Sequence, residues 1–294
     1  MGFQWFVRDD FCGWVSQDVT LPAGLSTDAT CVSSLAGAET LLDCKLRNIY
    51  RAPLRRGDQT LSCFFYFFRH NSLHEALRSG PPFRIQRMAE ILRDHGFESL
   101  DVVAALRPRR QLLKWTSLLI ASEVRSVFEL PSVGTHVFQI HKWIDFDQTV
   151  ASALARELAR FHDCAFFHGD LKSRHILTRA ASTENSEDKH LSFMLVDLEK
   201  TRRMPHLPYP ARDILAARDL IQLLASLPTE FDGHRLQPAR DLLLEEYLSG
   251  RSISTRRAAF IRRVLEMYGP GGALVQGKTV LGSLASHLIR KNAD

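Results

Sequence analysis

The chain has 294 residues, of which 45% are hydrophobic and 24% charged; this composition is typical of a folded globular protein and excludes a disordered or collagen-like class. Its net charge of +5 comes mainly from scattered arginines, without the aromatic–basic alternation that stacks bases, so we expect no nucleic-acid partner. The five cysteines have no CxxC spacing and predict neither a disulfide framework nor a zinc site, which favours a reducing compartment.

The N-terminal segment MGFQWFVRDDFCGW has no charged region followed by an apolar one, so it is not typical of an export signal. No apolar run approaches the roughly 18–20 residues that a transmembrane helix needs. We therefore expect a cytoplasmic protein, and any contact with a membrane is expected to be peripheral and to come from the cytoplasmic side, where arginines suit an anionic surface.

The first part of the chain is β-rich. Residues 1–45 show no regular pattern and are expected to form an N-terminal extension with the first strands. From Arg47, two β-rich runs flank the turn signal RRGDQ and predict a hairpin. The segment FRIQRMAEILRDHG predicts an amphipathic helix that ends at Gly96, and the apolar runs VVAAL and LLKWTSLLIASEV predict further strands.

The second part is mainly helical. The segment DQTVASALARELARFHD predicts a core helix that leads directly into the loop FFHGD. HILTRA and LSFMLVDLE predict a hairpin around the polar segment 181–190, and helical patterns follow at about 211–224, 237–248 and 254–268. Strands with one helix, followed by helices with one hairpin, predict an α+β protein with a β-rich N-lobe at 46–125 and a mainly helical C-lobe at 126–294.

Two acidic residues, Asp170 and Asp197, carry the clearest chemical signal. Each follows a predicted strand or helix, and the predicted hairpin between them brings these ends together. Phosphoryl transfer needs one carboxylate to orient the attacking hydroxyl and accept its proton, and another to hold magnesium against the phosphates. Asp170 suits the first role and Asp197 the second, while Lys172 can offset the charge of the transferring phosphoryl group.

The segments HGDLKSRHIL, residues 168–177, and MLVDLEKTR resemble the catalytic and metal-binding loops of the protein-kinase-like superfamily. Within that two-lobed fold they are most similar to the lipopolysaccharide core kinase family, the WaaP-like Kdo and heptose kinases. His175 stands where most kinases have Asn, and this family also tends to have His there. The resemblance implies ATP and Mg²⁺, a core saccharide acceptor, and a role for His175 at the metal or the phosphates.

Three further positions follow from this resemblance. DLE replaces the DFG of protein kinases. Gly169 occupies the place of the Arg that senses a phosphorylated activation loop in regulated kinases, so that form of control is not expected. Asp219 is placed like the buried aspartate that braces the backbone of the catalytic loop.

The predicted N-lobe departs from the kinase pattern. The strand Lys and helix Glu that hold the nucleotide phosphates would fall at Tyr66 and Ile85, and neither residue type is present. A glycine-rich phosphate loop is also missing, since SLAGAETLL offers only Gly37.

Other residues are candidates for nucleotide binding. Glu123 and Val124 sit where a kinase hinge offers backbone groups to adenine. The candidates for the cation that replaces the missing strand Lys are Arg69, Lys45 and Lys114, and Glu90 is the candidate for the carboxylate that replaces the missing helix Glu.

Two alternative functions stay open. A pseudokinase that acts as a binding or scaffold module would explain the missing Lys and Glu, but not the retention of Asp170, Lys172 and Asp197 together. A kinase for a soluble small molecule, such as an aminoglycoside or choline, also uses an HGD loop, but His175 and the DLE segment differ from that pattern. The oligomeric state is left open by the sequence.

Overall fold

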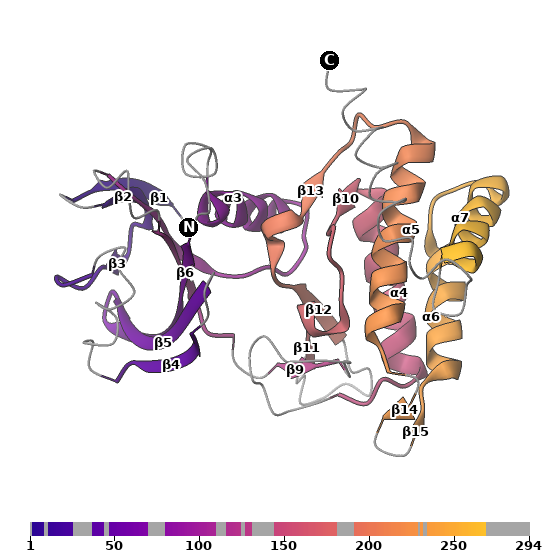
Figure 1. Cartoon of the computed structure of the whole chain (residues 1–294), viewed down its shortest axis with the longest axis horizontal. Coiled ribbons are helices and arrows are strands. Elements are labelled where there is room, and N and C mark those ends of the chain that lie inside the picture. Colours follow the sequence, from indigo (N-terminus) through magenta and orange to yellow (C-terminus); the bar gives the residue numbers. More distant parts are fainter. Residues whose placement is uncertain are drawn as a thin grey trace. The chain divides into compact units, whose positions relative to one another are not determined.

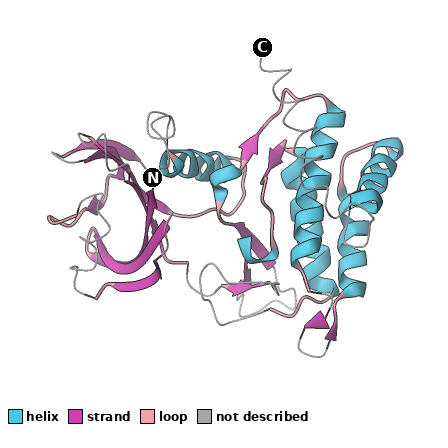
Figure 2. Cartoon of the chain, viewed as in Figure 1, coloured by secondary structure: helices cyan, strands magenta, loops and turns pink. Residues whose placement is uncertain are grey.

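The computed structural model divides the chain into two compact units, Met1–Arg125 and Ser126–Asp294, and each is considered by itself. Figure 2 shows strands dominating the first unit and helices the second. The residues described are 2–8, 11–25, 37–43, 47–69, 80–109, 116–124, 127–130, 144–180, 191–228, 230–231 and 234–268.

One antiparallel sheet of eight strands forms most of the first unit, and it curls around its own core (Figure 1). The strand order is β1-β2-β7-β8-β6-β5-β3, and β4 pairs with β5. The strands are β1 Phe3–Val7, β2 Phe11–Ser16, β3 Val19–Thr20, β4 Glu39–Asp43, β5 Arg47–Arg56, β6 Gln59–Arg69, β7 Val102–Pro108 and β8 Thr116–Ser122.

The predicted hairpin is confirmed as β5 and β6, which pair from Arg47↔Phe68 to Arg56↔Gln59. Its two-residue connection places Gly57 in the left-handed region, at φ 56°, where glycine is not penalised. Residues 1–45, despite their irregular pattern, supply β1 to β4. These strands are short or lie near the ends of the sheet, so little periodicity marks them in the sequence.

The predicted helix is confirmed as α3, Pro81–Asp94, which packs against β7 and β8. Gly96 follows the capping residue His95, and its φ of 74° allows the N–H of Phe97 to reach the carbonyl of Leu92 at 3.0 Å. Ile85 and Leu92 are buried on its inner face. The aromatic run of β6 is buried as well, as expected of a core strand.

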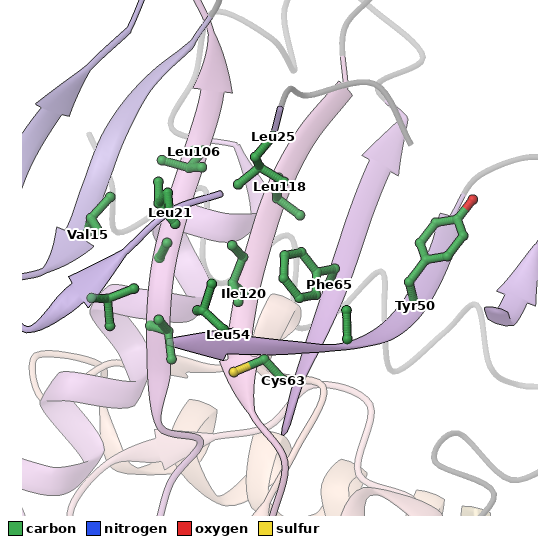
Figure 3. Close-up of a cluster of buried hydrophobic side chains, with 14 of the residues drawn as sticks. Val15, Leu21, Leu25, Tyr50, Leu54, Cys63, Phe65, Leu106, Leu118 and Ile120 are labelled. Carbon is green, nitrogen blue, oxygen red and sulfur yellow. The ribbon is translucent and has the colours of Figure 1, made fainter. Parts of the chain in front are cut away.

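The core of the first unit gathers side chains from β2, β5, β6, β7 and β8, many of which Figure 3 labels. It contains Cys63, which is fully buried between β5 and β8. Burial raises the pKa of this thiol to about 12, so Cys63 is protonated and acts as a small apolar side chain.

The second unit consists of helices and small sheets. The predicted core helix is α4, Gln148–Asp163, and Asp147 caps it by accepting a hydrogen bond from the N–H of Val150. The predicted hairpin is β11, Ile176–Ala180, with β12, Leu191–Leu195; its connection, 181–190, lies outside the described residues. Strand β9, Phe128–Glu129, also pairs with β11.

The later helices are α5 Tyr209–Ser226, α6 Gln237–Gly250 and α7 Thr255–Tyr268. Helix α6 packs against α4, and α7 against α5. The remaining elements are the strands β10 Phe166–Phe167, β13 Arg202–Arg203, β14 Glu230–Phe231 and β15 His234–Arg235, with the short helices η1 Ser173–His175 and η2 Leu198–Lys200. In the described part of the chain, no helix is both long and apolar enough to cross a membrane.

Candidate active site

The loop with the HGD motif begins where α4 ends. Ala165, at φ 61°, turns the chain out of the helix into β10, and the loop then runs through η1 into β11. Strand β10 pairs with β13, which lies just beyond Asp197. The β11–β12 hairpin and the β10–β13 pair therefore bring the segments around Asp170 and Asp197 to the same place.

Asp170 holds two ammonium groups. The Nζ atom of Lys172 lies 2.9 Å from Oδ1, and the Nζ atom of Lys200 lies 3.0 Å from Oδ2. Burial raises the pKa of Asp170, but hydrogen bonds from the two lysines outweigh it and lower the pKa to about 2. The carboxylate is therefore ionised at neutral pH, and a ligand that displaces either lysine would raise its pKa.

His175 connects the two acidic residues. Its Nδ1–H donates to the carbonyl of Asp170 at 2.8 Å, so the lone pair of the neutral ring is on Nε2, which lies 3.7 Å from Oδ2 of Asp197. Burial lowers the pKa of His175 although Asp197 acts in the opposite direction. Asp197 itself has left-handed backbone angles, φ 57° and ψ 49°, which Asp tolerates better than most residues.

His168, the first residue of the motif, is fully buried. Its Nε2–H donates to the carbonyl of Val196 at 2.9 Å, and its ring stacks on that of His175 with centroids 5.8 Å apart. The N–H of Val196 in turn donates to the carbonyl of His175 at 2.9 Å. These contacts fasten the loop to the segment that carries Asp197.

One face of α5 holds the backbone of this loop. Three polar side chains of α5, spaced three and four residues apart, accept its N–H groups. Asp219 is buried and accepts from His168 at 2.6 Å and from Gly169 at 2.9 Å, which confirms the predicted brace. The other bonds run from Leu171 N–H to Gln222 Oε1, 3.1 Å, and from Ser173 N–H to Ser226 Oγ, 2.7 Å.

A chain of buried side chains continues from Asp219 to α6. Arg251 donates to the Tyr247 hydroxyl at 2.6 Å, and that hydroxyl lies 2.7 Å from Nδ1 of His162. Nε2 of His162 lies 3.4 Å from Asp219. A carboxylate only accepts, so the neutral ring donates from Nε2 to Asp219, its Nδ1 accepts from the Tyr247 hydroxyl, and the hydroxyl oxygen accepts from Arg251. Sequence reasoning missed this chain.

His162 makes the stability of the second unit depend on pH. Burial lowers the pKa of His162 below its usual 6.5, although the hydrogen bond to Asp219 raises it. The unfolded chain therefore binds more protons below pH 6.5, and the free energy of unfolding should fall there by up to about 1.4 kcal/mol per pH unit. Urea denaturation from pH 7.5 to 5 should show a shallower fall for His162→Gln. Equal slopes in the two proteins would contradict this assignment.

Gly169 has a steric reason to lack a side chain. Its φ is 77°, and a Cβ atom there would lie 3.1 Å from the carbonyl oxygen of Lys200 and 3.3 Å from its Cβ. The backbone next to Asp170 thus packs directly against the segment that follows Asp197.

The first unit holds the other predicted positions. Tyr66 and Ile85 are both buried in it. Arg69 is exposed at the end of β6, and Glu90 is half-buried on α3. Lys45 and Lys114 lie outside the described residues.

Arg51 on β5 is a cation that sequence reasoning missed. It pairs with Glu39 of β4 and, at 3.2 Å, with Glu123, which follows β8. The backbone N–H of Glu123, a predicted adenine contact, already donates to the carbonyl of Ser62 at 2.8 Å. Val124, the other predicted hinge residue, is half-buried. Side chains alternate between the two faces of a strand, so the sequence alone does not show which strands lie beside Arg51. Only the pairing of the strands reveals Glu39 and Glu123 as its partners.

Three solved structures resemble the chain at low identity. WaaP in complex with acyl carrier protein aligns at 16% identity, covering 88% of this chain and 91% of that one, with a TM-score of 0.47. The Rio2 kinase–ADP/Mg²⁺–phosphoaspartate complex from Chaetomium thermophilum aligns at 15% identity, covering 78% of this chain and 69% of that one, with a TM-score of 0.41. A type I macrolide 2′-phosphotransferase aligns at 14% identity, covering 85% of this chain and 90% of that one, with a TM-score of 0.45. Among curated proteins, none matches the sequence significantly.

The family comparison matches the parts of the chain that build this site. The model of the lipopolysaccharide kinase (Kdo/WaaP) family matches residues 67–239, from β6 to α6, and so includes Asp170, Asp197 and Asp219. The first unit is β-rich and the second mainly helical, as the predicted α+β class requires. Because the match spans more than half of its length, the chain belongs to the lipopolysaccharide kinase family, a family of phosphotransferases.

Proposed function

We propose that this protein uses ATP and Mg²⁺ to phosphorylate a hydroxyl of a Kdo or heptose residue in the inner core of lipopolysaccharide. The observation that carries the proposal is that His175 lies between the Asp170 carbonyl and the Asp197 carboxylate, on a loop whose backbone α5 holds at four N–H groups. Phosphoryl transfer depends on such fixed placement of charges, because the protein contributes little covalent chemistry.

In the proposed reaction, Asp170 orients the acceptor hydroxyl and takes its proton. Its low pKa makes it a weak base, which suits a transfer whose transition state is loose and develops little charge on the attacking oxygen. Lys172 leaves Oδ1 of Asp170 for the phosphoryl group, and this exchange raises the proton affinity of the carboxylate when the substrates are bound.

The donor set around Asp197 fits magnesium. Mg²⁺ is usually held by one or two carboxylates, and water and substrate phosphates fill its other positions. Among the described residues no three His, Cys, Asp or Glu side chains converge, which agrees with such a sparse site. Asp197 would hold the ion, which would neutralise charge on the phosphates when bound, and Nε2 of His175, which accepts from Nε of Arg174 at 3.4 Å, lies 3.7 Å from the same carboxylate.

The nucleotide contacts proposed in the first unit are Val124, the carbonyl of Glu123, and a cation from Arg69. Arg51 is a further candidate, because nucleotide phosphates can compete with Glu39 and Glu123 for its guanidinium. The acceptor is proposed to be a lipid-linked saccharide at the cytoplasmic face of the inner membrane, where exposed arginines would contact anionic lipid.

A scaffold without catalysis is the second candidate. Tyr66 and Ile85 favour it, because both are buried in place of the Lys and Glu that anchor phosphates in other kinases.

An Asp197→Asn variant tests the proposal. Loss of the metal-binding charge should lower phosphate transfer from ATP to deacylated core oligosaccharide by about a hundredfold or more, with a higher Mg²⁺ requirement. Mass spectrometry of the oligosaccharide measures the transfer, and Asp241→Asn, an exposed carboxylate on α6, is the matched control. If the wild type binds ATP in a thermal-shift assay but transfers phosphate to no core acceptor, the result would favour the scaffold function over the proposed enzymatic one.

A further inference from the structure

Lys200 is a charged neighbour of Asp170 that the reaction described above does not use. It ends η2, three residues after Asp197, and its side chain is 63% exposed, against 33% for Lys172. Each lysine binds a different oxygen of the one carboxylate. Both lysines make charge-assisted hydrogen bonds to Asp170, so an anionic ligand that reaches either ammonium group can compete for it.

The backbone fixes the position of Lys200. On one side its carbonyl and Cβ pack against Gly169, and on the other side β13 pairs with β10 directly before the catalytic loop. Thr201, between Lys200 and β13, is buried, and its N–H donates to the carbonyl of Leu198 at 3.1 Å. The backbone of Lys200 is therefore fixed beside Asp170, although its side chain is mostly exposed to solvent.

An acceptor hydroxyl must reach one oxygen of Asp170, and in the proposed reaction Lys172 vacates Oδ1 when it moves to the phosphoryl group. Lys200 stays 3.0 Å from Oδ2, and its exposed ammonium group lies beside the carboxylate that receives the hydroxyl. A negative group next to the reacting hydroxyl can accept a charge-assisted hydrogen bond from this ammonium group, whereas a neutral sugar offers only the weaker bond to an uncharged acceptor.

We propose that Lys200 forms an anion subsite for the acceptor, and that it binds a carboxylate or phosphate carried next to the hydroxyl that Asp170 activates. This inference rests on the proposed function and specifies its substrate. The anion has two possible sources: the carboxylate of a sugar acid such as Kdo, or a phosphate monoester on a neighbouring sugar.

Matched acceptors separate these sources. One pair is a Kdo glycoside and its methyl ester, and the other is a heptose oligosaccharide with and without a phosphate monoester. For each pair, titration without nucleotide gives Kd, and steady-state transfer from ATP gives kcat and KM. The wild-type protein should bind the charged member of one pair with a Kd about tenfold or more lower than that of the uncharged member, which is the gain expected of a charge-assisted hydrogen bond.

Lys200→Gln should remove this preference by raising KM and Kd for the charged acceptor only, whereas Lys200→Arg should retain it. Arg256→Gln, which removes an exposed charge on α7, should leave the preference unchanged. A lysine that only supports Asp170 would change kcat equally for both members of a pair. An equal preference in wild type and Lys200→Gln, with transfer intact, would overturn the subsite alone; no transfer to any acceptor by wild type would overturn the proposed function with it.

Discussion

Replacement of Asp170 by Asn should lower kcat for phosphate transfer by roughly 10²–10⁴-fold, the contribution of a positioned general base. Asn has nearly the same shape, so the loop keeps its backbone bonds to α5, but the amide cannot take a proton. Lys172 and Lys200 also lose the anion that they share, and their mutual repulsion is no longer offset. The decrease in kcat should therefore occur in a folded protein.

Binding and transfer should separate in this variant. Asp170→Asn should still bind ATP, because the proposed nucleotide contacts do not include this carboxylate, and Asp241→Asn should transfer phosphate at the wild-type rate. In cells that carry Asp170→Asn, mass spectrometry of the lipopolysaccharide core should show the loss of one phosphate. An unchanged core phosphate pattern would contradict a role in core phosphorylation.

Replacement of Asp219 by Ala should have the largest effect on stability, about 3–5 kcal/mol in the free energy of unfolding. The change leaves the N–H groups of His168 and Gly169 buried without their acceptor and removes the partner of His162. The loop loses its fixed position, so kcat should fall by about a hundredfold or more even at a temperature where the variant is folded. Urea denaturation and transfer assays measure the two effects.

Asp213 provides a matched control on the same helix. It is equally buried and pairs with Arg257 at 2.8 Å and with Arg251 at 3.8 Å, but it accepts no hydrogen bond from the loop that carries Asp170. Asp213→Asn should therefore lower stability while kcat per folded molecule stays near the wild-type value. If both variants lose stability and kcat in the same proportion, Asp219 has no special role in positioning the loop.

The second unit was the more predictable part of the fold. Its helices are long and amphipathic, so Leu154 and Leu158 mark the buried face of α4 in the sequence itself. The candidate site could be assigned because Asp170 and Asp197 lie in short motifs at the ends of regular elements. The role of Asp219 followed from the resemblance to kinases, and its carboxylate on α5 accepts hydrogen bonds from the backbone of the loop.

Long-range polar contacts could not be predicted. His162 and Tyr247 are 85 residues apart, and nothing in the sequence around either one indicates the other. The same holds for Arg51, whose partners depend on which strands become neighbours. Lys200 looks like an ordinary surface lysine until the β10–β13 pair places it beside Asp170.

The contact between Gly169 and Lys200 limits how this enzyme can be re-engineered. A phosphate-operated switch of the protein-kinase type needs an Arg at position 169, and the left-handed backbone and the nearby carbonyl both disfavour that side chain. A backbone shift that made room for Arg would also carry Lys200 away from Asp170. Such a switch would therefore require the redesign of residues 198–203 together with the loop, and no single substitution would install it.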